Sequence, residues 1–179
     1  MNIFIGSSSS EEINEVYKER SSNLIDLLSK ENNLVFGSAN RGLMGICYRK
    51  FKENNRKIIG VCYELYKDDL KELELDEVHM VNNLEESNKK LEQLSDIILF
   101  LPGSFGTLSE FIYILETKRT NLHNKEIIVF NIDGFFDNLI NQFNIINNNV
   151  SKKYDYKKLC NVFDNENDIN EYINNKKNS

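Results

Sequence analysis

A short stretch past the middle of the chain, LPGSFGTLSE, holds the residue types best suited to chemistry. It follows the apolar run DIILF and contains the single proline of the chain, Pro102, and two glycines three residues apart, Gly103 and Gly106. Proline removes a backbone donor where strand pairing should stop, and the glycines permit a tight turn. The N–H groups and hydroxyls of Ser104, Gly106 and Thr107 could then bind one phosphate at a helix N-terminus.

A plain strand-to-helix turn, with Thr107 as the helix cap, would use similar residues. Two other loops favour a ligand site, because IGSSSS and FGSANRGLMG also join a strand to a helix through glycine and serine. Carboxyl ends of parallel strands meet at one edge of a sheet, so Gly6, Ser7 and Gly37 are expected to converge with the first loop. Neither a Walker lysine nor a G-x-G-x-x-G fingerprint is present.

Glu110 lies three residues after Thr107, on the same face of the predicted helix. A carboxylate at this position could act as a base or hold ribose hydroxyls. The alternative interpretation is that it only complements the positive end of the helix dipole.

Apolar runs and helical patterns alternate along the whole chain. This order predicts an α/β fold: a Rossmann-like, doubly wound, mostly parallel sheet with helices on both faces. It is expected to form one nucleotide-binding domain over residues 1–179, with a polar linker at 146–158 and a frayed tail near 174–179. The expected strands are 2–6, 33–38, 57–64, 77–83, 96–103, 125–134 and 158–165, and the expected helices are 11–33, 42–55, 84–96, 106–120, 135–149 and 166–175.

Composition narrows the function classes. The net charge of -6 argues against binding a nucleic-acid polymer, which depends on neutralising phosphates. No apolar run reaches the roughly 18 residues of a membrane span, and MNIFIGSS does not resemble a signal peptide. Cys47, Cys62 and Cys160 show neither disulfide nor zinc spacing. We therefore expect a cytoplasmic protein without a metal, a cofactor or a membrane partner.

The quoted stretch resembles the signature of the Lonely Guy family of nucleoside 5′-monophosphate phosphoribohydrolases, also labelled lysine decarboxylase-like. The family pattern P-G-G-x-G-T-x-x-E is matched from Pro102 to Glu110, with Ser104 in place of one glycine. FGSANRGLMG, the early GSS and NIDGFFDNLI are similar to further family blocks, in order, from about Asn2 to Asn147.

The resemblance implies hydrolysis of the N-glycosidic bond of a cytokinin-type or AMP-like nucleotide, through an oxocarbenium-like transition state. It implies Glu110 as the catalytic carboxylate, the loop residues as the substrate site, and a homodimer. The helix with EFIYILE is apolar on more than one face, so we expect the dimer to be built largely from the helices flanking the signature, this one included. Pyridoxal-dependent decarboxylation is not indicated, because no lysine lies in a strand-end loop of the expected kind.

One position departs from the family. Counting back from Asp96 without gaps, the family's arginine and the Lys or Asn after it fall at Ser87 and Asn88. Serine cannot supply a fixed cation or a bidentate clamp. Lys90 or Arg41 could substitute, and without a substitute catalysis would be impaired.

Three functions remain open from the sequence. The first is an active phosphoribohydrolase. The second is a non-enzymatic sensor or carrier of a nucleotide or cofactor that uses the same phosphate pocket. The third is a structural or interaction protein with a relic pocket. Product analysis with adenosine monophosphate separates the first two, and a ligand-induced thermal shift separates the last two.

Overall fold

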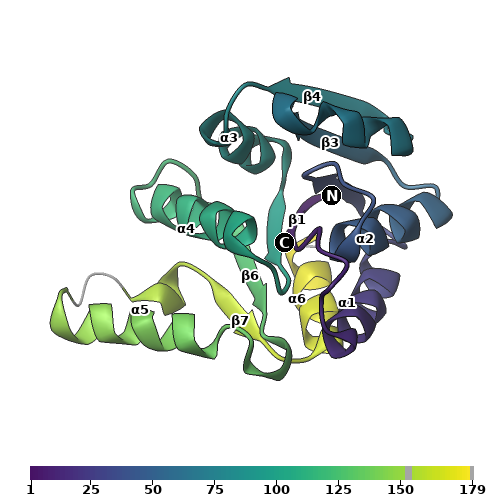
Figure 1. Ribbon diagram of the computed structural model, residues 1–179. Helices are drawn as coiled ribbons and strands as arrows, with labels where there is room; N and C mark the ends of the chain where they lie inside the picture. Colours follow the sequence, from purple (N-terminus) through teal and green to yellow (C-terminus); the bar gives the residue numbers. More distant parts are fainter. Residues whose placement is uncertain (152–154, 178–179) are drawn as a thin grey trace.

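A computed structural model describes residues 1–151 and 155–177 of the chain. In this part, seven parallel strands form one sheet in the order β4-β3-β2-β1-β5-β6-β7 (Figure 1). The strands are β1 (Asn2–Gly6), β2 (Asn33–Phe36), β3 (Ile58–Tyr63), β4 (Glu77–Val81), β5 (Ile97–Phe100), β6 (Glu126–Phe130) and β7 (Asn161–Phe163). The helices are α1 (Glu15–Leu28), α2 (Gly42–Glu53), α3 (Leu84–Leu94), α4 (Phe105–Arg119), α5 (Asp137–Asn149) and α6 (Glu166–Lys177), with short 3-10 segments η1 (Glu64–Glu72), η2 (Ile132–Gly134) and η3 (Tyr156–Lys158).

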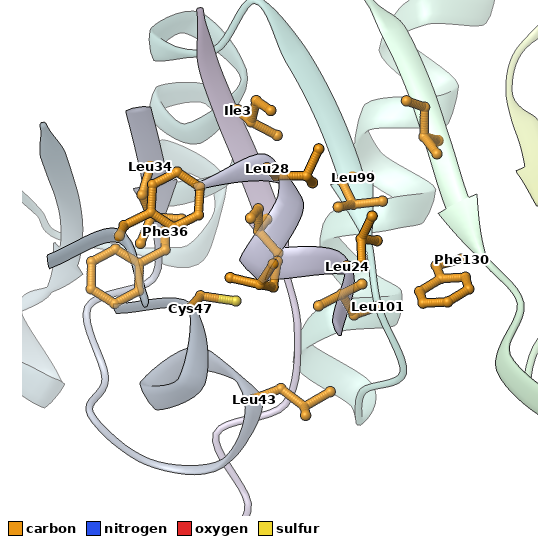
Figure 2. Close-up of a cluster of buried hydrophobic side chains, with 14 of the residues drawn as sticks. Ile3, Leu24, Leu28, Leu34, Phe36, Leu43, Cys47, Leu99, Leu101 and Phe130 are labelled. Atoms are coloured by element: carbon orange, nitrogen blue, oxygen red, sulfur yellow. The ribbon is translucent and has the colours of Figure 1, made fainter. Parts of the chain in front are cut away.

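Both faces of the sheet are apolar and each is covered by helices, which confirms the predicted fold class. Side chains alternate along β1, so Ile3 and Ile5 face α1, α2 and α6, while Phe4 faces α3, α4 and α5. Figure 2 shows part of the first core layer, where Leu24 and Leu28 of α1 lie over the strands. The two helical layers lie on opposite sides of the sheet in Figure 1.

The strand order reverses between β1 and β5. From β1 the chain adds β2, β3 and β4 in one direction, then returns to place β5 on the other side of β1. The crevice at the carboxyl ends of two such strands is where open α/β sheets bind ligands. A ligand site is therefore expected at the loops that follow β1 and β5.

Several predicted boundaries were wrong. Helix α1 begins at Glu15, because residues 7–14 form a loop that ends at Asn14, whose side chain accepts a hydrogen bond from Val16 N. Strand β6 ends at Phe130, since the backbone then turns through a positive φ of 48° at Asp133.

The predicted tail and linker also need correction. Residues 174–177 are not frayed, because α6 continues to Lys177; Lys176 pairs with Glu126 at 2.6 Å and Lys177 with Glu31 at 3.1 Å. Residues 178–179 lie outside the described part. Of the expected linker, residues 146–149 belong to α5, 156–158 form η3, and 152–154 are not described.

None of the described helices combines the length and the apolar composition needed to cross a membrane.

Phe111→Ala should lower the free energy of unfolding by about 3–5 kcal/mol, the range for truncating a buried phenylalanine. Phe111 is 2% exposed, and its ring contacts those of Phe100 and Phe136. Urea unfolding measures this loss. Phe105→Ala is the matched control on the same helix, because Phe105 is 89% exposed and its truncation should change stability by less than about 0.5 kcal/mol. Equal losses in both variants would contradict the packing described.

Candidate functional site

Backbone hydrogen bonds hold the loops after β1 and β5 side by side. Gly6 pairs in register with Phe100, and Leu101 N donates to Gly6 O at 2.9 Å. The pairing continues past the strands, where Ser8 N donates to Pro102 O at 3.3 Å. Both loops thus leave the sheet at the switch point.

The loop after β2, which includes Gly37, packs onto the loop after β1. Met44 N donates to Ser8 O at 3.1 Å, and Gly42 has a φ of 56°. A Cβ on Gly42 would lie 2.5 Å from Ser10 O, so only glycine fits this contact. The three predicted loops are therefore neighbours at one edge of the sheet.

The helices at this edge differ at their N-termini. Three of them are capped by side chains: Asn14 caps α1, Asn83 caps α3, and the carboxylate of Glu11 accepts from Gly42 N of α2 at 3.0 Å. Helix α4 has no side-chain cap at Ser104 and no acidic residue in its first turn. Its first N–H groups, from Phe105 to Thr107, have no acceptor within the described residues. The N-terminus of α4 is therefore the position where an anion is favoured.

The predicted signature residues have distinct positions in this turn. Ser104 and Gly106 are exposed, and space is open around Gly106. Thr107 is 3% exposed, and its Oγ1 would lie 2.1 Å from a Cβ on residue 103, so Gly103 makes room for it. Thr107 can therefore offer its N–H to a ligand more readily than its hydroxyl.

Two other serines of these loops are turned inward. Ser7 is 1% exposed, so its side chain is not presented to a ligand. Only its backbone N–H group could contact one. Ser38 adopts a positive φ of 60° and its hydroxyl donates to Val61 O at 3.2 Å. The bond from Ser38 ties its loop to β3, whereas the buried hydroxyl of Ser7 has no hydrogen-bond partner within the described residues.

Glu110 reaches back from α4 to the end of β1. The residue is half-buried, and its Oε2 atom is buried without a hydrogen-bond partner in the described residues. This oxygen lies 3.2 Å from the position of a Cβ on Gly6, so the glycine gives the carboxyl its space. Burial raises the pKa of Glu110 to about 8.

Arg41 and Lys90 were the candidates to substitute for the family arginine. Within the described residues, neither forms an ion pair with Glu110. Ser87 is half-buried and Asn88 is 7% exposed on α3, which packs beside α4. Arg41 is held by Asp69 at 2.8 Å. Lys90 makes no ion pair within the described part of the chain.

Two determinants of the site were not predicted. Glu11 closes the N-terminus of α2 through a contact that spans 31 residues of sequence. The inward bond of Ser38 likewise depends on β3, a separate strand. Neither contact leaves a local pattern in the sequence.

The cysteines offer no nucleophile at neutral pH. Burial raises the pKa of both Cys47 and Cys160 to about 12, and it raises the pKa of Cys62 as well. Within the described residues, no group of three or more His, Cys, Asp or Glu side chains could hold a metal ion.

Comparisons with known proteins identify a matching family model and similar sequences. The model of a family described as "Possible lysine decarboxylase" matches residues 44–173. A protein named "Probable cytokinin riboside 5'-monophosphate phosphoribohydrolase" from Oryza sativa subsp. japonica is 29% identical over 118 residues, 65% of this chain and 51% of the relative. A cytokinin riboside 5'-monophosphate phosphoribohydrolase of Arabidopsis thaliana is 28% identical over 142 residues, 77% of this chain and 60% of the relative. The matches thus span about half to three fifths of these relatives.

Solved structures show a similar fold. The molybdenum cofactor binding protein from the phototrophic bacterium Rippkaea orientalis superposes with a TM-score of 0.67 at 17% identity, covering 97% of this chain and 95% of that one. At this identity the likeness concerns the fold alone.

The raised pKa of Glu110 predicts a pH-dependent stability. A carboxyl that binds its proton more tightly when folded lowers the stability of the folded state as pH rises from its ordinary pKa of 4.5 to about 8. Glu110→Gln removes this effect. The free energy of unfolding of the variant minus that of the wild type should therefore increase over this window, by up to about 1.4 kcal/mol per pH unit.

Urea unfolding at several pH values within this window measures the difference. Glu116→Gln is the control on the same helix, because the hydrogen bond from Arg119 lowers the pKa of Glu116 and keeps it ionised. Its difference from the wild type should stay flat. A flat difference for Glu110→Gln as well would show that its carboxyl ionises normally.

Proposed function

This chain belongs to the family described as "Possible lysine decarboxylase", the Lonely Guy family, and on that premise we propose that it is a phosphoribohydrolase of nucleoside 5′-monophosphates. The proposed reaction cleaves the N-glycosidic bond and yields a free base and ribose 5-phosphate. Cytokinin-type and AMP-like nucleotides are the proposed substrates.

One observation supports this proposal most directly: the uncapped N-terminus of α4 lies beside Glu110, whose Oε2 atom is buried, at the switch point of the sheet. An anion fits the first of these features, since N–H groups and the helix dipole both favour negative charge. Glu110 lies about one turn further along α4 than the residues that would bind the phosphate. This spacing suits a nucleotide whose phosphate and glycosidic bond are separated by one ribose.

In the proposed complex, Ser104, Gly106 and the N–H of Thr107 bind the phosphate, while Gly103 permits the turn. Gly6, Ser7 and Gly37 provide close backbone approach from the neighbouring strands. Glu110 is the catalytic carboxyl at the ribose. Ser87 and Asn88 of α3 contribute the remaining wall, in the position where the family has a basic pair.

The serine at position 87 lowers the proposed activity. Loss of one preorganised electrostatic group typically reduces kcat about 10²–10³-fold. Arg41 is engaged by Asp69, so it does not provide an immediate replacement. We therefore expect slow hydrolysis in this protein.

A carrier or sensor of a nucleotide or cofactor is the second candidate. The same replacement that weakens catalysis would leave a phosphate site intact, and a protein of similar fold is described as a molybdenum cofactor binding protein. Fold likeness alone does not transfer function, so this candidate depends on the altered site.

A homodimer through α4 is also proposed. Helix α4 buries Phe111 and Ile114 against the sheet, yet Ile112 is 44% exposed. A largely apolar cavity of about 300 Å³ lies beside it, between α4 and α5, with Phe143 and Ile146 in its lining. A helix that is apolar on more than one face is suited to burial by a second partner, and a second copy of this chain is the proposed one.

Incubation with adenosine monophosphate and chromatography of the products tests the function. We expect slow release of adenine, at least about 10²-fold slower again in Glu110→Gln, with nucleotide binding retained. Glutamine keeps the shape and a donor group but can neither carry charge nor transfer a proton. Glu53→Gln, on the exposed C-terminal end of α2, is the control and should match the wild type.

Ser87→Arg, with Asn88→Lys if needed, should raise the rate about 10²–10³-fold. Fast release by the unmodified protein, with no rise in these variants, would mean that Ser87 does not mark a lost catalytic group. Binding without any release, in all variants, would favour the carrier.

Light scattering at micromolar concentration tests the dimer, with an expected mass of about twice 20.9 kDa. Ile112→Glu places a charge on the proposed interface and should give monomers. Leu65→Glu is the control, because Leu65 is 70% exposed but lies on η1, outside α4 and α5. A monomeric wild type, or equal effects of the two variants, would contradict this interface.

A further inference from the structure

The carboxyl of Glu110 has no counter-ion in the described part of the chain. Its Oε2 atom is buried and unpartnered against Gly6. The adjoining strands β1 and β5 have the sequences NIFIG and IILF, which contain no charged residue. Helix α4 itself has no charged residue before Glu110.

Helix α3, packed beside α4, does not supply a cation. Burial, and after it the acids Glu85 and Glu92 of α3, raise the pKa of Tyr113 of α4. Glu92 pairs with Lys125 at 2.7 Å. Among the described residues, the lysines of α3 make no ion pair with Glu110.

The charged side chains of the surrounding loops already have other partners. Arg41 binds Asp69, and Glu11 accepts from Gly42 N. Ser87 stands where the resemblance places the family arginine. The position that the resemblance assigns to the arginine thus carries a neutral side chain.

A carboxyl with a buried, unpartnered oxygen and no nearby cation holds its proton more tightly, because desolvation disfavours the ionised form. Burial is the cause that raises the pKa of Glu110 to about 8. At neutral pH the group is mostly a carboxylic acid, which can donate a hydrogen bond as well as accept one.

We propose that Glu110 meets the bound nucleotide as a protonated acid, donating a hydrogen bond to it, so that a proton takes the place of the cation missing at Ser87. This inference rests on the proposed nucleotide site. It changes the role of Glu110 from a charged stabiliser to a donor, and it makes ligand binding dependent on pH.

The donor role has a direct consequence for hydrolysis. As the bond between C1′ and the base nitrogen breaks, the base leaves with the bonding electron pair and takes the proton of Glu110 on a ring nitrogen. Water then bonds to C1′ and releases a proton, which returns the carboxylate to the acid. The products are the neutral base and ribose 5-phosphate, with no co-reactant other than water.

Two measurements on the full chain test the inference. The first is a nuclear magnetic resonance titration of protein labelled with carbon-13 in its glutamate carboxyls, where the Glu110 signal is identified by its loss in Glu110→Gln. We expect it to titrate about three and a half pH units above exposed glutamates. The second is calorimetric binding of adenosine monophosphate at pH values of about 7 and 9.5. Wild-type affinity should fall at least about tenfold, because only the protonated fraction binds well.

Glu110→Gln is the matched control for binding, since its amide donates at every pH. Its affinity should stay within about twofold between the two conditions. Titration of Glu110 together with the exposed glutamates would overturn the inference, as would wild-type affinity that is absent at neutral pH or unchanged at high pH. The predicted binding behaviour without any adenine release would instead support the donor role and refute only the phosphoribohydrolase.

Discussion

The parallel pairing of β1 with β5 is the constraint on which the site depends. Leu101 N donates to Gly6 O at 2.9 Å, and one further bond from Ser8 N to Pro102 O carries the pairing beyond the strands. This pairing fixes where the glycine turn ends and therefore where α4 begins. It also places Gly6 under the carboxyl of Glu110. A Cβ at position 6 would lie 2.6 Å from the Phe100 ring and 3.2 Å from Oε2 of Glu110. Glycine at this position is therefore needed both for the packing of the strand pair and for the site.

The fold could be predicted because its signals are local and repeated. Seven apolar runs alternate with helical patterns, and strands buried on both faces read as continuous apolar segments such as IILF in β5. Boundaries were less predictable. Helix α6 continues to Lys177 because of pairs with Glu126 and Glu31, which are distant in sequence. The 3-10 segment η1 has no buried residue, so it adds no core positions by which the sequence could have indicated it.

The site was predictable to the level of its loops. Glycine and serine at three strand ends indicated where the backbone could approach a ligand. The signature from Pro102 to Glu110 indicated that the helix now seen as α4 carries the site. The sequence could not show which helix N-terminus is left open for an anion, because the acid that closes α2 is Glu11, which lies on another loop. Nor could it indicate that Ser7 and Ser38 turn inward, since burial depends on the packed neighbours. The raised pKa of Glu110 likewise depends on burial, which the local sequence does not show.

A crystal structure of the Glu110→Gln variant with adenosine monophosphate tests the central claim most directly, because slow turnover keeps the nucleotide intact. The proposed site predicts the phosphate beside Ser104 and on the N–H groups of Phe105, Gly106 and Thr107, with the ribose C1′ beside residue 110. Those groups have no acceptor within the described residues, and the turn around Gly106 is open. Nucleotide bound at another edge of the sheet, or a side chain packed into that turn, would contradict it.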